Sequence, residues 1–225
     1  MVIFRENTED LYMGLEEKIS DDEFHSIKVI TRKKSERIIR AAFEYAQKFN
    51  RKKVTIVTKA NIMKFTDGLF LNVGREIANS FPNIEFEELL VDNTAMQMVQ
   101  NPNKFDVLVT ENLYGDILSD LGAGLVGGLG LIPGVNKGED ISIYESVHGS
   151  APDIAGKNLA NPIAILLTAS LMLDDIGEGN LAGKLRKSIE KTMEDKKNHT
   201  KDLGGDASLE KITQEIIKNL GGEDE

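Results

Sequence analysis

Two aspartates one helical turn apart are the first candidates for chemistry in this sequence. Asp116 and Asp120 stand at positions i and i+4 of the segment NLYGDILSDL, a spacing that puts them on one helix face about 6 Å apart. Like charges at this spacing repel, and solvent exposure is the simplest way to tolerate them. The apolar and small residues around them argue against a purely solvated face. Oxygen ligands without histidine or cysteine are typical of Mg²⁺ or Mn²⁺ rather than zinc.

Three more polar residues follow apolar runs that read as strands, namely Arg5, Lys59 and Asp92. In open α/β sheets, ligands bind at the carboxyl ends of the strands, so these residues could line one site. Each has an ordinary alternative. Arg5 could pair with its acidic neighbours, Lys59 could be a surface lysine, and Asp92 could cap a helix.

A loop of small residues, HGSAPDIAG at positions 148–156, is the last candidate. Small residues let the backbone approach a ligand closely. Asn161 follows, and Pro162 after it predicts the start of a helix. A locally bonded loop histidine and a helix-capping asparagine are the ordinary alternatives for His148 and Asn161.

Composition excludes several classes of protein. The 225 residues are 40% hydrophobic and 28% charged with a net charge of −10, which indicates a globular protein and argues against binding to nucleic acid or an anionic membrane. The absence of cysteine excludes disulfides and zinc–thiolate sites. No apolar run reaches the roughly 18 residues of a membrane span, and the first residues lack a signal-peptide pattern. The expected location is the cytoplasm.

The elements that would position these residues alternate between strand and helix, which predicts an α/β fold with a largely parallel sheet. Strands are predicted at Val2–Arg5, Phe24–Ile30, Val54–Thr58, Glu85–Val91, Phe105–Thr110 and Ile141–Ser146. Helices are predicted at Ser35–Phe49, Thr66–Ser80, Thr94–Val99, Gly115–Leu125, Pro162–Ile176, Leu181–Met193 and Ser208–Leu220. The segment Met13–Ile30 fits a hairpin, and the tail Gly221–Glu225 is predicted to fray.

Glycine-rich nucleotide motifs do not account for the sequence. GAGLVG at positions 122–127 matches the dinucleotide fingerprint by pattern. The genuine fingerprint follows a strand and opens a helix, whereas this match falls at the end of the predicted helix that carries Asp116. Close packing and helix termination explain it better. The phosphate-binding P-loop pattern is absent from the sequence.

Four motifs in one order resemble the β-decarboxylating dehydrogenases of the isocitrate and isopropylmalate dehydrogenase family. They are RENTEDLY at 5–12, KANIMK at 59–64, NLYGD at 112–116 with Ser119 and Asp120, and HGSAPDIAG at 148–156. The resemblance covers the chain from Val2 to about Leu220. It implies a homodimer, or a larger homo-oligomer, with shared active sites.

The resemblance also implies roles for individual residues. Arg5 would clamp a substrate carboxylate, Tyr12 and Lys59 would handle protons, and Asn61 in the lysine motif would contact the substrate. Mg²⁺ or Mn²⁺ would be held by three carboxylates, of which one comes with Lys59 from the neighbouring subunit. Those ligands are Asp116, Asp120 and the neighbour's copy of Asp92.

The cofactor implied by the resemblance is NAD. The matching loop supplies Glu145, His148, Gly149, Ser150, Ala151, Asp153, Ile154 and Asn161. An acidic residue such as Asp153 accepts a hydrogen bond from the ribose 2′-hydroxyl and repels a 2′-phosphate. Lys201 and Gly205 stand where enzymes of the NADP branch carry tyrosine and arginine.

The substrate implied by the resemblance is a 2-hydroxy acid, and the RENTED segment resembles isocitrate enzymes. Homoisocitrate and isopropylmalate enzymes are the alternatives. Residues 1–126 would form the small domain, with a dimer clasp near 13–30, and residues 127–225 the carboxyl-terminal part of the large, cofactor-binding domain. Family chains carry a further amino-terminal segment, so a non-catalytic assembly or regulatory chain is a second hypothesis.

Overall fold

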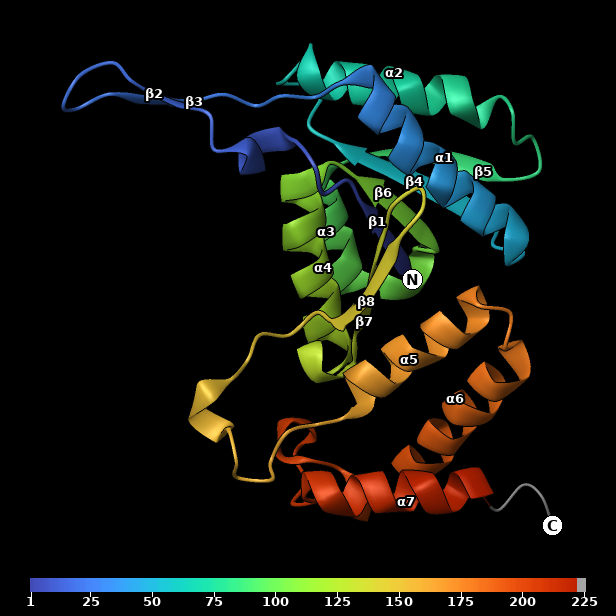
Figure 1. Ribbon diagram of the computed structural model, residues 1–225. Coiled ribbons are helices and arrows are strands. Elements are labelled where there is room, and N and C mark those ends of the chain that lie inside the picture. Colours follow the sequence, from blue (N-terminus) through green and yellow to red (C-terminus); the bar gives the residue numbers. More distant parts are fainter. Residues whose placement is uncertain (222–225) are drawn as a thin grey trace. The chain divides into compact units, whose positions relative to one another are not determined.

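The computed structural model describes residues 1–221. The chain divides into two compact units, Met1–Gly122 and Ala123–Glu225, the second of which is described as far as Gly221 (Figure 1). Helix α4 (Asn112–Val126) runs from the first unit into the second. The tail that was predicted to fray lies outside the described residues, apart from Gly221, which is helical.

Unit 1 is built on a four-stranded sheet in the order β1-β6-β4-β5, and every neighbouring pair of strands is parallel. Its strands are β1 (Val2–Arg5), β4 (Lys53–Thr58), β5 (Glu85–Leu90) and β6 (Val107–Thr110). Parallel neighbours need crossover connections, which the helices provide. The predicted α/β class with a parallel sheet is therefore confirmed.

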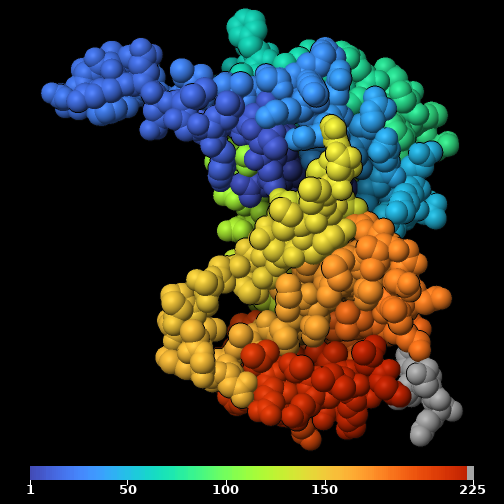
Figure 2. Space-filling view, viewed as in Figure 1, coloured from blue at the N-terminus to red at the C-terminus, as the bar shows by residue number. Residues whose placement is uncertain are grey.

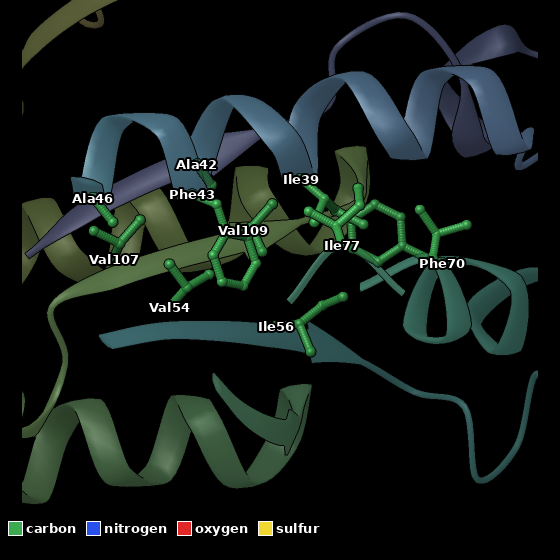
Figure 3. Close-up of a cluster of buried hydrophobic side chains, with 11 residues drawn as sticks. Ile39, Ala42, Phe43, Ala46, Val54, Ile56, Phe70, Ile77, Val107 and Val109 are labelled. Carbon is green, nitrogen blue, oxygen red and sulfur yellow. The ribbon is translucent and has the colours of Figure 1, made fainter. Parts of the chain in front are cut away.

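Helices cover both faces of this sheet. The crossovers are α1 (Arg32–Lys48), α2 (Thr66–Ala78) and α3 (Val91–Gln100), and α4 follows the last strand of the sheet. Side chains of α1 recur at helical spacing and pack with α2 on alternate residues of β4 and β6 (Figure 3). The intervening strand residues Val57 and Leu108 face Met98 of α3 and Leu118 of α4. The period of two in the strands thus builds two cores, one on each face.

The segment predicted as a hairpin forms β2 (Glu16–Lys18) and β3 (Phe24–Ser26), which pair antiparallel. All six strand residues are exposed, and the hairpin projects from the body of unit 1 (Figures 1 and 2). A two-stranded hairpin buries little of its own surface and is marginal when isolated in water. The predicted strand Phe24–Ile30 is correspondingly shorter in the structure and ends at Ser26.

As far as Gly221, unit 2 contains an antiparallel hairpin and three helices besides the end of α4. Its elements are β7 (Pro133–Lys137), β8 (Ser142–Ser146), α5 (Ile163–Asp175), α6 (Gly179–Glu194) and α7 (Leu209–Gly221). Isoleucines of the three helices pack into one buried cluster. The sequence prediction missed β7, because PGVNK has low β-propensity and only pairing with β8 makes it extended.

Short 3₁₀ turns complete the chain, at η1 (Asp10–Met13), η2 (Pro102–Lys104), η3 (Leu129–Leu131), η4 (Pro152–Ile154), η5 (Lys196–Asn198) and η6 (Lys201–Leu203). The GAGLVG match lies in the last turns of α4 and just after it, as predicted. Among residues 1–221, no helix has the length and apolar character needed to cross a membrane.

The core of unit 1 should be sensitive to truncation at Phe43. This side chain is fully buried between α1 and the sheet, so Phe43→Ala should lower the free energy of unfolding by about 3–5 kcal/mol through lost burial and a residual cavity. Urea unfolding measures it. Glu44→Ala, at an exposed position of the same helix, should change it by less than about 0.5 kcal/mol. Equal effects of the two substitutions would contradict this account of the core.

Candidate functional site

The parallel sheet brings all the polar candidates of unit 1 to one edge. Arg5 ends β1, Lys59 directly follows β4, and Asp92 lies one residue beyond the start of α3, which follows β5. Because β1 neighbours β6 and β4 neighbours β5, their carboxyl ends meet in pairs. The result is two side-chain clusters, one from β1 and β6 and one from β4 and β5.

The first cluster joins Arg5, Tyr12 and Asp116. The Arg5 guanidinium pairs with Asp116 Oδ1 and donates from Nε to Asn112 Oδ1 at 2.8 Å. The Tyr12 hydroxyl donates to Asp116 Oδ2 at 2.7 Å, and Arg5 Cζ lies 5.1 Å from the centroid of the Tyr12 ring. Both oxygens of Asp116 are therefore held by residues with predicted roles at the substrate.

The acidic neighbours of Arg5 in the sequence have other partners, so the internal ion pair of Arg5 is formed with Asp116 instead. Glu6 accepts from Arg37 Nη2 at 2.9 Å, and Glu9 accepts from the Thr31 amide at 2.7 Å. Both carboxylates are buried. The acidic residues of RENTED thus fold the turn after β1, and they leave the guanidinium of Arg5 to face Asp116.

Electrostatics keep the proton on Tyr12 and the charge on Asp116. The hydrogen bond to Asp116 raises the pKa of the Tyr12 hydroxyl above its usual value. The same bond, followed by the charge of Arg5, lowers the pKa of Asp116. At neutral pH the cluster is therefore a carboxylate shared by a guanidinium and a protonated phenol.

The second cluster is an ion pair between Lys59 and Asp92, whose Nζ and Oδ1 atoms lie 2.6 Å apart. The hydrogen bond from Lys59 lowers the pKa of Asp92. Lys59 is only 25% exposed in its side chain, so it is not a simple surface lysine. Asp92 is not an N-cap either, because Leu90 occupies that position. Asn61 is exposed in the turn after β4 and lines an open surface cavity of about 310 Å³.

The three predicted metal ligands do not meet within one chain. Asp120 is exposed one turn after Asp116, and its side chain makes no hydrogen bond or ion pair within residues 1–221. Over the same residues, no group of three acidic or histidine side chains is close enough to hold a metal ion. The pair on α4 therefore needs a further ligand from outside this set.

In unit 2 the predicted cofactor residues lie in an exposed loop between β8 and α5. Glu145 is on β8, and residues 147–153 are all exposed. His148 Nδ1 lies 3.0 Å from the carbonyl of Gly149, so its ring has a local partner, as its ordinary alternative requires. Ala151 adopts φ 43°, a left-handed conformation that is uncommon for alanine.

Asn161 ends this loop and does two things at once. Its Oδ1 accepts from the Ile163 amide, the first amide of α5, at 3.0 Å, although Pro162 occupies the N-cap position, and its Nδ2 donates to Asp202 at 3.0 Å. Gly205, which follows η6, has a steric reason to be glycine. A Cβ there would lie 2.1 Å from the His199 carbonyl oxygen, so the backbone excludes a longer side chain at this position.

Sequence reasoning missed a buried charge network beneath the site. Lys28 Nζ donates to Asp67 Oδ1 at 2.6 Å and to Glu111 Oε2 at 2.7 Å. Asp67 Oδ2 in turn accepts from the Lys59 amide at 2.6 Å and from Tyr114 at 3.1 Å. The residues are far apart in sequence, so no local spacing marks them. The one available signal is a charged residue, Glu111, set between a buried strand and an apolar helix.

A family model described as isocitrate/isopropylmalate dehydrogenase matches residues 1–220 of the chain. A probable NAD isocitrate dehydrogenase subunit alpha of Drosophila melanogaster mitochondria is 52% identical over 220 residues, 98% of this chain and 58% of that protein. Homoisocitrate dehydrogenase of Methanocaldococcus jannaschii is 52% identical over 220 residues, 98% and 62% of the two chains. The crystal structure of isocitrate dehydrogenase from Methylococcus capsulatus matches with a TM-score of 0.91 at 51% identity, covering 97% of this chain and 66% of that one.

The chain spans 58% and 62% of the length of these two curated relatives. Activities, substrates and partners of the longer proteins are therefore properties of those proteins. Since the fly relative is named as mitochondrial, the cytoplasmic location expected from the sequence stays a prediction.

Gly115 should be essential to the first cluster. A Cβ at this position would lie 2.5 Å from Arg5 Cγ and from Thr110 Oγ1, so Gly115→Ala should push Arg5 away from Asp116 and lower the free energy of unfolding by about 1–3 kcal/mol. Gly68→Ala, at a helical position with open space, should raise that free energy by up to about 1 kcal/mol. Urea unfolding compares the two, and effects of the same sign would refute the close approach.

Glu111 should make stability depend on pH. Burial raises the pKa of this carboxyl from 4.5 to about 8 in the folded chain. Between these values the folded state keeps a proton that the unfolded state has released, so the free energy of unfolding falls as pH rises from 4.5 to 8. The fall should be on the order of a few kcal/mol and absent in Glu111→Gln. Urea unfolding at pH 5.5 and pH 8.5 tests this, with Glu44→Gln as the exposed control. An equal change in the free energy of unfolding between the two pH values in the wild type and in Glu111→Gln would exclude the effect.

Proposed function

The chain belongs to the isocitrate and isopropylmalate dehydrogenase family, and from this premise we propose that it serves the NAD-dependent oxidative decarboxylation of isocitrate to 2-oxoglutarate. The observation that carries the proposal is the cluster of Arg5, Tyr12 and Asp116 at the carboxyl edge of the sheet. In the proposed roles, Arg5 binds a substrate carboxylate, Tyr12 donates a proton and Asp116 binds the metal ion. These three side chains contact one another at this edge.

The donor set fits a hard divalent cation. Asp116 and Asp120 offer carboxylate oxygens on successive turns of α4, and oxygen ligands suit Mg²⁺ or Mn²⁺. When bound, such an ion supplies Lewis-acid polarisation of the substrate oxygens. Asp116 would then give up its ion pair with Arg5, and the guanidinium would become available to a substrate carboxylate.

The protein groups have separate tasks in this reaction. Arg5 presents N–H donors that match a carboxylate in a bidentate geometry. In the proposed reaction the hydroxyl-bearing carbon of isocitrate would give up a hydride to bound NAD, the hydroxyl would give up its proton, and the bond to the departing carboxylate would break to release CO₂. Tyr12, which holds its proton at neutral pH, is the proposed proton donor to the carbon left behind. Lys59 is the proposed second proton-transfer group.

NAD is the proposed cofactor, and the exposed loop between β8 and α5 is its proposed site. Asp153 is exposed on this loop, where its carboxylate can accept from a ribose 2′-hydroxyl. The residues proposed to surround the cofactor are Glu145 near the end of β8 and, in the loop, His148, Gly149, Ser150, Ala151, Asp153, Ile154 and Asn161.

A second copy of the chain would complete the site. Asp92 and Lys59 form their own pair at β4 and β5, and the carboxylates of α4 lack a third ligand within the described residues. A two-fold dimer brings one surface of each chain against the other. We therefore assign Asp92 and Lys59 to the active site of the partner, with the exposed β2–β3 hairpin as the dimer clasp.

Homoisocitrate is the second candidate substrate, because the homoisocitrate dehydrogenase relative is as similar to this chain as the NAD isocitrate dehydrogenase relative. The two acids differ by one methylene. One methylene changes specificity by only about 1–3 kcal/mol, so pocket length and not the catalytic groups would separate them.

The test is NADH formation by the 225-residue chain with Mn²⁺ and, in turn, isocitrate, homoisocitrate and isopropylmalate. Isocitrate should give the highest kcat/KM, and Asp116→Asn should weaken Mn²⁺ binding measured by electron paramagnetic resonance. Mn²⁺ binding and self-association without turnover would identify a non-catalytic family member instead. A chain that shows no turnover and does not bind Mn²⁺ would overturn the proposal.

Mixing two inactive variants tests whether sites are shared. Asp116→Asn and Lys59→Met damage opposite halves of the proposed site, so a randomly reassorted mixture should recover about one quarter of wild-type activity through mixed dimers. A mixture of Asp116→Asn with Arg5→Met, which damages the same half, should recover none. An inactive first mixture would place both residues in one chain's own site.

A further inference from the structure

Beneath the proposed active site, one ammonium group lies among three buried carboxylates. Lys28 Nζ is bonded to Asp67 and Glu111 and lies 3.9 Å from Asp10 Oδ1. The side chains of all three acids are 0% exposed, and that of Lys28 is 9% exposed. The ammonium also lies 4.6 Å from the centroid of the Tyr114 ring. The proposed reaction uses none of these four ionisable side chains.

Each carboxylate fastens a different segment of the site. Asp67 accepts from the backbone amide of Lys59 at 2.6 Å, and so holds the turn that carries the proposed proton-transfer lysine. Asp10 opens the turn η1, which carries Tyr12, and accepts from the Leu113 amide at 2.9 Å.

The third carboxylate, Glu111, directly precedes Asn112. The Asn112 side chain accepts from Arg5 Nε at 2.8 Å and donates to the Glu9 carbonyl at 3.1 Å. The start of α4 therefore sets the position of the proposed substrate arginine. The segments that carry Tyr12, Asn112 and Lys59 come from separate parts of the chain and meet at this network.

We propose that Lys28 is a positioning residue of the proposed active site, because its single ammonium group holds these three segments together. Lysine suits this task since its ammonium carries three donors and no acceptor. The inference rests on the proposed function for its catalytic meaning, and on the hydrogen bonds alone for the geometry.

Lys28 also ties the site to the projecting hairpin. It lies just beyond β3, and the next residue, Val29, accepts from the Asp10 amide at 2.9 Å. The base of the hairpin and the turn of Tyr12 are thus joined by a backbone bond and by the buried network. Movement of the hairpin relative to the sheet would therefore shift the position of Tyr12 through Lys28.

A purely stabilising ion pair is the competing explanation, and buried ion pairs are weak evidence for stability. Glu111 Oε1 is buried without a hydrogen-bond partner among the described residues, and three acids outnumber one lysine. Burial raises the pKa of Glu111 to about 8, which leaves this carboxyl largely protonated at neutral pH. A network built only for stability would not need the extra acid.

The test compares Lys28→Met with a matched control, Lys53→Met. Lys53 is also mostly buried and paired with a carboxylate, Glu87, at 3.2 Å, but it lies at the opposite end of β4. Hydrogen exchange of the Lys59 and Leu113 amides, measured against the β4 amide of Ile56, should accelerate at least tenfold in Lys28→Met only. The same variant should lose at least tenfold in kcat, with a smaller change in KM.

If Lys28→Met does not fold, Lys28→Met/Glu111→Gln, which has one buried acid fewer, is compared with Glu111→Gln alone. Exchange that rises equally at Lys59, Leu113 and Ile56, or rises in the Lys53→Met control as well, would reduce Lys28 to a stabilising residue and overturn the proposal. If the wild-type chain is active and Lys28→Met shows the selective rise in exchange but keeps the wild-type kcat, the proposal is also overturned. Hydrogen exchange can be measured in a chain that shows no turnover. Failure of the dehydrogenase proposal can therefore be distinguished from failure of the proposed role of Lys28.

Discussion

Parallel pairing of β1, β6, β4 and β5 is the constraint on which the rest of unit 1 depends. Every strand of such a sheet ends at the same edge, and ligands of open α/β sheets bind there. The strand order also decides which candidates meet, since Arg5 faces the segment after β6 while Lys59 faces the segment after β5. An order with β1 next to β5 would have brought Arg5 to Asp92 instead.

Each proposed catalytic charge is paired with a proposed metal ligand in the single chain. Arg5 holds Asp116 and Lys59 holds Asp92. Such pairs keep exposed or half-exposed charges in place at little energetic cost, and a cation or an anionic substrate can replace them by exchanging one ionic partner for another. The charged groups are thus ordered before any ligand is present, which limits the entropy lost on binding.

Burial separates the acidic residues of the site into two classes. Asp92, Asp116 and Asp120 are exposed or half-exposed and remain available to ligands, whereas Glu9, Asp10 and Asp67 are buried and bind backbone amides. Composition alone does not distinguish these classes, because the same residue type serves both. A carboxylate with two or more amide or ammonium donors in the interior positions its neighbours, and one at the surface with a single mobile partner can change partners.

The sequence by itself determined the alternation of strand and helix, the limits of β1, the hairpin before α1 and the motifs at Arg5, Lys59 and Asp116, because these depend on local periodicity and on short spacings. The parallel sheet and the family followed from the same local patterns. Only the tertiary structure decided that Arg5 turns to Asp116 and not to its acidic neighbours, that PGVNK becomes β7, and that Lys28, Asp67 and Glu111 share one buried network. These outcomes depend on pairing and burial between residues distant in the chain, which local spacing does not mark.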